Sequence, residues 1–194
     1  MKTLWVDTAS NFLYVGLTEV TLVYSCQKIG QNNHSELLLE TIKEGMKSLN
    51  WRPKDLQRIV VGIGPGSYTG LRVSLTVAKM LAWTLNIPLY TISSLDFAVS
   101  SYCKQNKSYL VLLQAKRNYH YMKTISFKNQ KVASSSPEVF LEDEEIKKYS
   151  LENPHLIVIK EDAFSYNPSL VDSNLLTKVD DIFLLEPNYL RGVL

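Results

Sequence analysis

A glycine-rich segment at residues 62–72, Gly-Ile-Gly-Pro-Gly-Ser-Tyr-Thr-Gly-Leu-Arg, constrains the fold of this chain more than any other stretch. It holds four of the eight glycines, follows the apolar run Ile59-Val60-Val61 and precedes a long apolar stretch with helical spacing. Glycine is favoured where the backbone takes positive φ or another backbone comes close. The segment therefore predicts a strand that turns tightly into a helix, with N–H groups at the helix start free for an anion or a partner. It is not a Walker loop, because no Lys-Ser or Lys-Thr follows the glycines.

The overall composition is that of an ordinary globular protein. Of 194 residues, 45% are hydrophobic and 21% are charged, and the net charge is only +2, which excludes strong steering toward nucleic acid. Cys26 and Cys103 form neither a metal-ligand pattern nor a disulfide framework, so we expect a reducing cytoplasm. Polar residues and a proline interrupt the longest apolar stretch, 71–90, and we therefore expect no membrane span.

The order of predicted elements indicates an α/β fold with mixed sheets flanked by helices. We expect strands at 3–7, 12–18, 22–27, 58–63 and 88–92, and helices at 34–49, 70–86 and 95–104. A polar stretch at 105–108 suggests a boundary, which gives an N-terminal subdomain at 1–104 and a smaller α/β subdomain at 105–194. In the second we expect strands at 109–113, 119–127, 156–159 and 182–185, a short charged helix at 142–149, and a loop or irregular edge at 128–137.

Several motifs together resemble one family. They are Leu-Trp-Val-Asp-Thr-Ala-Ser at 4–10, His34-Ser35 opening a helix, Gly-Pro-Gly-Ser-Tyr-Thr-Gly-Leu-Arg at 64–72, Ser-Ser-Leu at 93–95, Ala-Lys-Arg at 115–117 and Pro-Asn-Tyr-Leu-Arg at 187–191. The chain is similar to the TsaB (YeaZ) family, the non-catalytic relatives of TsaD. The resemblance implies the ribonuclease-H-like half of the actin-like ATPase fold. Gln114 departs from the pattern, since the family usually has Asp there.

The chemistry of an active site is missing from the sequence. The resemblance places the first nucleotide-binding turn at Asp7, Thr8 and Ser10, which we interpret as a vestigial nucleotide site. A second phosphate-binding turn requires glycine, and none occurs between Gly70 and Gly192. We therefore expect no ATP cleft and no cofactor.

Metal and nucleophile chemistry are also not predicted. The resemblance to TsaD puts Ser94 and Ala98 where that enzyme carries a His-x-x-x-His pair, and neither residue replaces an imidazole ligand. Ser67 lacks the glycine two residues later that a nucleophile elbow needs, because Thr69 stands there. We predict no metal site and no catalytic residue.

Two helices carry more apolar surface than one core requires, and this surplus is the positive signal in the sequence. Burial under the second subdomain is one explanation, and a helix-on-helix interface is the other. The resemblance favours the interface, because in TsaB these helices pair with those of TsaD or of a second TsaB. The expected partner-binding residues are Leu38, Leu39, Ile42, Met46, Val73, Val77 and Met80. The loop residues Gly64, Pro65, Gly66, Ser67, Tyr68, Thr69, Gly70 and Arg72 are expected to set the register of the second helix.

The resemblance implies a scaffold in tRNA threonylcarbamoyladenosine synthesis. It would dimerise with TsaD, which transfers threonylcarbamoyl to adenosine 37 of tRNA, and would help to recruit the ATPase TsaE. Contact with tRNA would be indirect, although a role for Arg117 or Arg191 stays open, as does a homodimer of the isolated chain. A charge at Val77 is expected to weaken association without unfolding the subunit. The alternative is an ATP-binding phosphotransferase or a metallopeptidase-like enzyme of the same superfamily.

Overall fold

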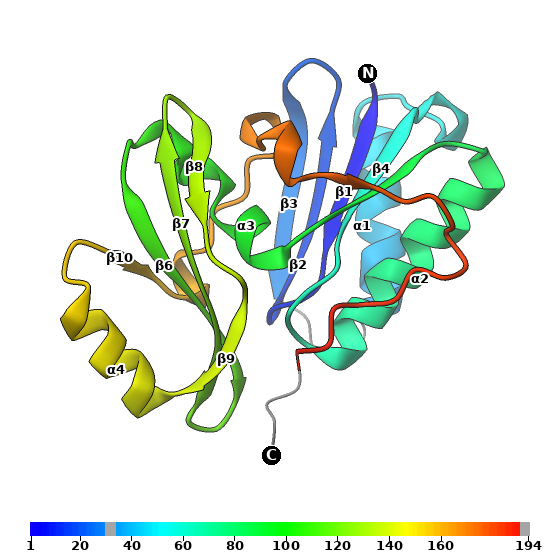
Figure 1. Ribbon diagram of the computed structural model, residues 1–194. Coiled ribbons are helices and arrows are strands. Elements are labelled where there is room, and N and C mark those ends of the chain that lie inside the picture. The colour runs from blue at the N-terminus through cyan, green and yellow to red at the C-terminus, as the bar shows by residue number, and fades with distance from the viewer. Residues whose placement is uncertain (30–33, 191–194) are drawn as a thin grey trace.

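Two β-sheets stand side by side and are covered by helices on their outer faces (Figure 1). The structure is a computed structural model and describes residues 1–29 and 34–190. From one side of the molecule to the other the layers are α1 with α2, the first sheet, the short helix α3, the second sheet and α4. No helix among the described residues is both long and apolar enough to cross a bilayer.

The first sheet contains six strands in the order β11-β5-β4-β1-β2-β3. Its strands are β1 (Thr3–Asp7), β2 (Phe12–Thr18), β3 (Leu22–Ile29), β4 (Arg58–Gly62), β5 (Leu89–Ile92) and β11 (Thr177–Lys178). The first three strands run antiparallel to one another, whereas β4 and β5 run parallel to β1. The order 3-2-1-4-5 with this mixture of directions is that of a ribonuclease-H-like fold, as predicted.

Helices α1 (His34–Ser48) and α2 (Tyr68–Leu85) cover the outer face of the first sheet. A short 3-10 turn, Pro53–Asp55, links α1 to β4. On the other face lie α3 (Ser94–Ala98) and the 3-10 turn Ser100–Lys104. The sequence predicts one helix over 95–104, but the structure divides it, because the chain leaves α-helical geometry at Val99 (φ −115°, ψ 13°).

The second sheet has five strands, in the order β10-β6-β7-β8 with β9 also paired to β7. Its elements are β6 (Ser108–Lys116), β7 (Tyr119–Lys128), β8 (Lys131–Ser135), β9 (Val139–Glu142), α4 (Asp143–Glu152) and β10 (Ile157–Ile159). The predicted strands at 109–113, 119–127 and 156–159 and the predicted helix at 142–149 are confirmed. The stretch at 128–137, expected to be a loop or irregular edge, contains the edge strand β8, which pairs with β7 with a register shift although most of its side chains are polar and exposed.

The C-terminal part of the chain returns to the first sheet. After three 3-10 turns, Glu161–Ala163, Pro168–Leu170 and Ser173–Leu175, it adds β11 beside β5. The predicted strand at 182–185 is wrong, because this segment forms turns and extended chain along α2. We call residues 182–190 the C-terminal strap.

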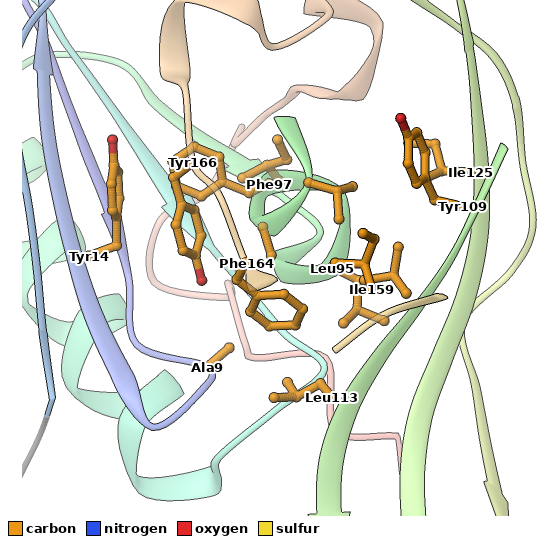
Figure 2. Packing of buried hydrophobic residues seen from close by; sticks show 14 of the residues in the cluster. Ala9, Tyr14, Leu95, Phe97, Tyr109, Leu113, Ile125, Ile159, Phe164 and Tyr166 are labelled. Atoms are coloured by element: carbon orange, nitrogen blue, oxygen red, sulfur yellow. The ribbon is translucent and has the colours of Figure 1, made fainter. Parts of the chain in front are cut away.

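Three hydrophobic cores fill the spaces between the layers. One lies between the first sheet and α1 with α2, and a small one lies between the second sheet and α4. The third joins the two sheets around α3, where the rings of Tyr14, Phe97 and Tyr166 pack together (Figure 2). Tyr14 stacks on Tyr166 with a centroid distance of 4.4 Å and meets Phe97 edge-on at 5.3 Å. These ring contacts hold α3 and the segment around Tyr166 on the first sheet through apolar burial.

Candidate functional site

The glycine loop closes over the turn between β1 and β2. A Cβ at Gly66 would overlap the carbonyl oxygen of Ala9, and one at Gly70 would overlap that of Thr8. Two hydrogen bonds fasten the same contact: Ser67 N–H donates to the Ala9 carbonyl at 2.7 Å, and the Thr8 hydroxyl donates to the Gly70 carbonyl at 2.6 Å. The glycines at 66 and 70 are thus required by the close approach of two backbones within the chain.

The other two glycines of the loop make room for different groups. Gly62 lies directly beneath the Asp7 carboxylate, where any side chain would collide with Oδ2. Gly64 has φ +105°, a conformation that favours glycine, and it faces the Asn188 carbonyl of the C-terminal strap. The Ser67 hydroxyl then caps α2 by accepting a hydrogen bond from Gly70 N–H at 3.2 Å. The loop therefore fixes where α2 begins.

The predicted vestigial nucleotide site lies in this packed turn. Asp7, Thr8 and Ser10 are all buried. Asp7 Oδ1 accepts a hydrogen bond from Ala9 N–H at 2.9 Å, whereas Oδ2 has no hydrogen-bond partner among the described residues. Burial raises the pKa of Asp7 to about 6, against smaller opposing effects of the Ser94 hydroxyl and the Ala9 amide. The polar groups of Thr8 and Ser10 are engaged within the turn and by Gly70.

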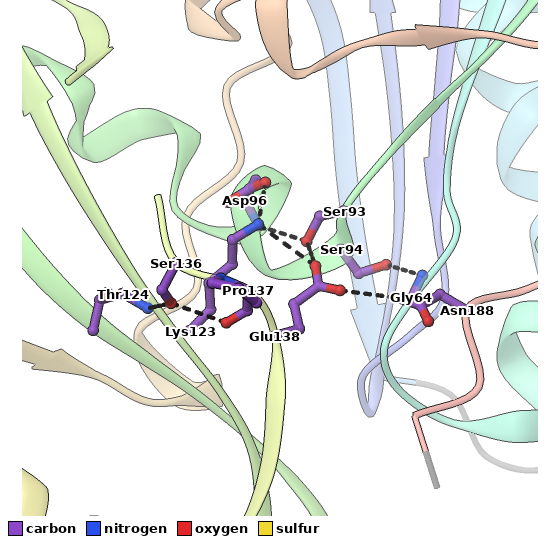
Figure 3. Close-up of polar contacts among 10 residues, drawn as sticks. All are labelled: Gly64, Ser93, Ser94, Asp96, Lys123, Thr124, Ser136, Pro137, Glu138 and Asn188. Carbon is purple, nitrogen blue, oxygen red and sulfur yellow. Dashed lines mark hydrogen bonds and ion pairs between the residues drawn. The ribbon is translucent and has the colours of Figure 1, made fainter. Parts of the chain in front are cut away.

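A buried charged network lies between the two sheets, and the sequence analysis missed it (Figure 3). Lys123 of β7 places its Nζ 2.7 Å from Asp96 Oδ2 and 3.6 Å from Glu138 Oε1. Glu138 accepts further hydrogen bonds from the Ser93 hydroxyl and from Asn188 Nδ2, the latter at 2.8 Å. Burial raises the pKa of Asp96 despite the neighbouring ammonium group.

The sequence of β7 contains a feature that could have predicted this network. Tyr121, Ile125 and Phe127 alternate on the face that packs toward the first sheet, and Lys123 occupies the same face. A lysine in an otherwise apolar row predicts a buried partner of opposite charge. Its partners, however, come from segments far away in the chain. Within the parts of the chain that the structure describes, no three His, Cys, Asp or Glu residues form a group that could hold a metal ion.

The structure divides the predicted partner-binding residues into two groups. Leu38, Ile42, Met46 and Val77 are enclosed in their own subunit, with at most 9% of each side chain exposed. Leu39 and Met80 are 48% and 62% exposed, and Val73 is half-buried. The expectation that the first four face a partner is therefore corrected. They face the first sheet, because the main apolar stripe of α1 and α2 packs into that core.

The exposed apolar surface lies mainly on α2 and the C-terminal strap. Trp83 is 66% exposed and its ring meets Phe183, 71% exposed, with a centroid distance of 6.4 Å. Lys79 Nζ ties the strap to α2 by donating to the carbonyl oxygens of Phe183 at 3.3 Å and Leu185 at 3.1 Å. We define the α2 face as the exposed side chains of Leu39, Tyr68, Arg72, Met80, Trp83, Phe183 and Leu184.

A hollow marks the α2 face where α1 and α2 meet. It has a volume of about 400 Å³ and is lined by Ser35, Tyr68, Thr69, Arg72, Val73, Thr76 and Val77. The Arg72 guanidinium lies 4.0 Å from the centre of the Tyr68 ring and donates to the Tyr189 hydroxyl at 2.9 Å. The loop residues Tyr68 and Arg72 thus belong to the surface, while Gly64, Pro65 and Gly70 are buried. Arg117 is exposed in the β6–β7 turn, and Arg191 lies outside the described residues.

The fold and this site define a class: a ribonuclease-H-like α/β protein whose glycine loop is closed on its own first turn and whose second helix presents an apolar face. Three comparisons agree with that class. A model of the family described as "TsaD: tRNA N6-adenosine threonylcarbamoyltransferase" matches residues 27–177. The chain belongs to this family, and within it to the TsaB/YeaZ family.

Two curated relatives share the name "tRNA threonylcarbamoyladenosine biosynthesis protein TsaB". The protein from Bacillus subtilis is 32% identical over 130 residues, which are 66% of this chain and 57% of the relative. The protein from Buchnera aphidicola subsp. Schizaphis graminum is 29% identical over 108 residues, 56% of this chain and 51% of the relative. The chain thus spans little more than half the length of these relatives.

A solved structure confirms the fold. It is described as an uncharacterized protein with similarity to peptidase YeaZ from Pseudomonas aeruginosa. The two chains superpose with a TM-score of 0.79 over 98% of this chain and 99% of that one, at 18% sequence identity. The match shows that the two-sheet arrangement with its flanking helices is the YeaZ fold.

Proposed function

We propose that this chain is a non-catalytic scaffold subunit in tRNA threonylcarbamoyladenosine biosynthesis. It dimerises with TsaD in the cytoplasm, supports threonylcarbamoyl transfer to adenosine 37 of tRNA by that enzyme, and helps the complex to recruit TsaE. The names of the TsaB relatives support the pathway. Contact with tRNA is indirect in this proposal, and the two helices of the α2 face belong to the subdomain that we assign to residues 1–104.

The observation that carries the proposal is the apolar character of the α2 face. Met80, Trp83 and Phe183 are each more than 60% exposed and lie on one helix and the strap beside it. Aromatic residues, Met and Arg are enriched in the centres of protein interfaces, and Arg72 adds a donor at the rim. A partner that covers about 800 Å² of this face would form a specific complex.

The packing of the glycine loop supports a role without catalysis. Its backbone is committed to the β1–β2 turn through the Ser67 and Thr8 hydrogen bonds. A loop held in this way keeps α2 in a fixed position, and a rigid helix suits docking because little entropy is lost when a partner binds.

Binding of the purified chain to the TsaD of the same cell tests the proposal. We expect Met80→Asp and Leu39→Asp to weaken the complex at least about tenfold, because each puts a charge into a desolvated apolar contact. Both side chains are exposed, so both variants should keep the wild-type unfolding midpoint. Isothermal titration calorimetry measures the affinity, and circular dichroism measures the fold.

Two further variants serve as controls. Leu151→Asp is matched in exposure, since Leu151 is 81% exposed, but it lies on α4 at the other side of the molecule and should leave the affinity unchanged. Val77→Asp is expected to lower folding stability, contrary to the expectation from sequence, because Val77 is only 9% exposed. Unchanged affinity in both Met80→Asp and Leu39→Asp would exclude the α2 face as the docking site.

A further inference from the structure

A groove that runs from the outer face of the second sheet to Asn11, Phe12 and Ile29 at the end of β2 and β3 lies apart from the α2 face and has no part in the proposed function. Two adjoining hollows form it, with volumes of about 520 Å³ and 590 Å³, and both are lined by Leu112, His120 and Lys160. Each volume falls in the range of small-molecule sites, roughly 300–1,000 Å³. We propose that this groove binds a small organic anion, a carboxylate or phosphate ester that carries an apolar body.

The groove exists because α4 is too short to cover the sheet. Its ten residues bury Leu110 and Met122 beneath Ile146. Farther along the same face, Leu112 borders the groove and Val158 of the short edge strand β10 is 42% exposed. The result is an apolar wall made by Leu112, Ile146, Leu151 and Val158 on one side of the hollow next to α4. Such a wall fits the apolar body of a ligand.

The charges in the hollow next to α4 favour an anion. Lys147 and Lys160 both line it, and neither makes an ion pair with any residue that the structure describes. The one carboxylate among its lining residues is Asp143, whose Oδ1 lies 2.8 Å from His120 Nδ1, so the two lysines outnumber the carboxylate. Two uncommitted ammonium groups beside an apolar wall match a carboxylate or a phosphate.

The other hollow, on the side of Asn11, determines which way round the ligand binds. It contains the carboxyl groups of Glu161 and Asp162, and Glu161 also accepts a hydrogen bond from Asn11 N–H. These two carboxylates repel a second negative charge. The ligand therefore places its single anionic end between Lys147 and Lys160 and a neutral or cationic end toward Asn11. A molecule that is anionic at both ends is disfavoured.

Titration followed by ¹H–¹⁵N NMR tests the proposal with three probes that share a benzene ring: phenyl phosphate, phenylacetate and benzyl alcohol. We expect saturable shifts of the Leu112, His120 and Lys160 amides with the two anions and weaker shifts with the neutral alcohol. Tighter binding of phenyl phosphate identifies a phosphate ester as the natural class, and equal or tighter binding of phenylacetate identifies a carboxylate.

The double variant Lys147→Ala/Lys160→Ala should weaken binding of both anions about tenfold, because each exposed charge contributes up to about 1 kcal/mol. The matched pair Lys43→Ala/Lys47→Ala removes two exposed lysines of α1 and should change nothing. Three results overturn the proposal: no saturable shift with either anion at millimolar concentration, equal affinity for benzyl alcohol, or unchanged affinity in the Lys147/Lys160 variant. Equal affinity for the alcohol would instead indicate an apolar surface suited to a protein partner.

Discussion

Asp7 combines full burial with one unpaired oxygen. Its backbone neighbour Gly62 leaves room for the carboxylate, and Ala9 N–H satisfies Oδ1, but Oδ2 has no hydrogen-bond partner among the described residues. Burial destabilises the ionised form of such a carboxylate relative to the same group in water. The ionised Asp7 therefore reduces folding stability at neutral pH.

Asn in place of Asp7 should make folding less dependent on pH. The pKa of Asp7 is about 6 in the folded chain and 3.8 in the unfolded reference, so between these values the folded state binds more protons. Folding stability must then decrease as pH rises through this window, by about 3 kcal/mol for this residue alone. Urea unfolding of the wild type and of Asp7→Asn at pH 4 and pH 7 measures the difference.

The two proteins should converge at pH 4, and the variant should be the more stable at pH 7. Asp96 also has a raised pKa and contributes a trend of the same sign, which both proteins share and which cancels in the comparison. A stability difference that does not change between pH 4 and pH 7 would contradict a buried, destabilised carboxylate at Asp7.

Helix α2 packs on its own sheet with one side and is exposed on the other. Gly70, Ser74, Ala78 and Ala82 form a stripe of small residues that is buried against the chain's own sheet and the β1–β2 turn. The opposite side carries Met80 and Trp83 to the surface. Ser67 caps the start of the helix, and Asn86 ends it in the left-handed conformation at φ 53°. The small stripe allows close packing on the sheet, and Leu71 and Leu75 are buried beside it, so that Met80 and Trp83 on the opposite side are left exposed.

The C-terminal strap should loosen when Lys79 is truncated. Lys79→Ala removes two hydrogen bonds to strap carbonyls while leaving the Arg72–Tyr189 contact in place. Hydrogen exchange of the amides at 182–190 should accelerate about 5- to 150-fold, since the two lost bonds together contribute roughly 1–3 kcal/mol. Exchange in β1 and β4 should not change. Mass spectrometry of the exchanged peptides provides the measurement.

Lys47→Ala is the matched control, because it removes an exposed helical lysine that has no bond to the strap. Equal exchange at 182–190 in wild type and Lys79→Ala would show that the strap is held by its apolar contacts alone.

At the scale of the molecule, the Lys123 network connects the second sheet with α3 and with the C-terminal strap. Lys123 comes from the second sheet, Asp96 from α3, Glu138 from the segment before β9 and Asn188 from the C-terminal strap (Figure 3). Asn188 N–H also bonds to the Ile63 carbonyl at 2.7 Å, which extends the connection to the glycine loop and the start of α2. The arrangement of the two sheets and the position of the α2 face are thus set by the same buried contacts.

Lys123→Met should destabilise the whole protein by about 3–5 kcal/mol at pH 7, because it leaves two buried carboxylates without their cation. The loss should be smaller at pH 5, where Asp96 takes up a proton more readily, given its raised pKa. Urea unfolding at the two pH values tests this. Lys128→Met, an exposed position on the same strand, should stay within about 0.5 kcal/mol of the wild type.

A loss below about 1 kcal/mol for Lys123→Met would mean that the network contributes little to joining the sheets. The double variant Lys123→Met/Asp96→Leu should recover part of the loss, because it removes one of the stranded charges.

Sequence alone was sufficient for features that depend on neighbouring residues. Alternation and β-branched runs located β1 to β7 and β10, and the glycine spacing located the turn into α2. It did not reveal β8, whose strand character comes from pairing with β7, and the boundary at residues 104 and 105 stays a prediction. For the partner face, the sequence indicated surplus apolar residues on α1 and α2, but not which of them point outward; binding of a partner by the exposed ones stays a prediction.

The tertiary structure decided everything that depends on residues distant in the chain. Burial of Leu38, Ile42, Met46 and Val77 follows from the sheet beneath them, while exposure of Met80 and Trp83 follows from the strap lying beside α2 and not over it. Asp96, the ion-pair partner of Lys123, lies 27 residues away in the chain, and Asn188, which binds Glu138 of the same network, lies 50 residues from Glu138; no local pattern specifies such a meeting. Periodicity records which side of an element is apolar, whereas only the packing of the whole chain determines which apolar side remains uncovered.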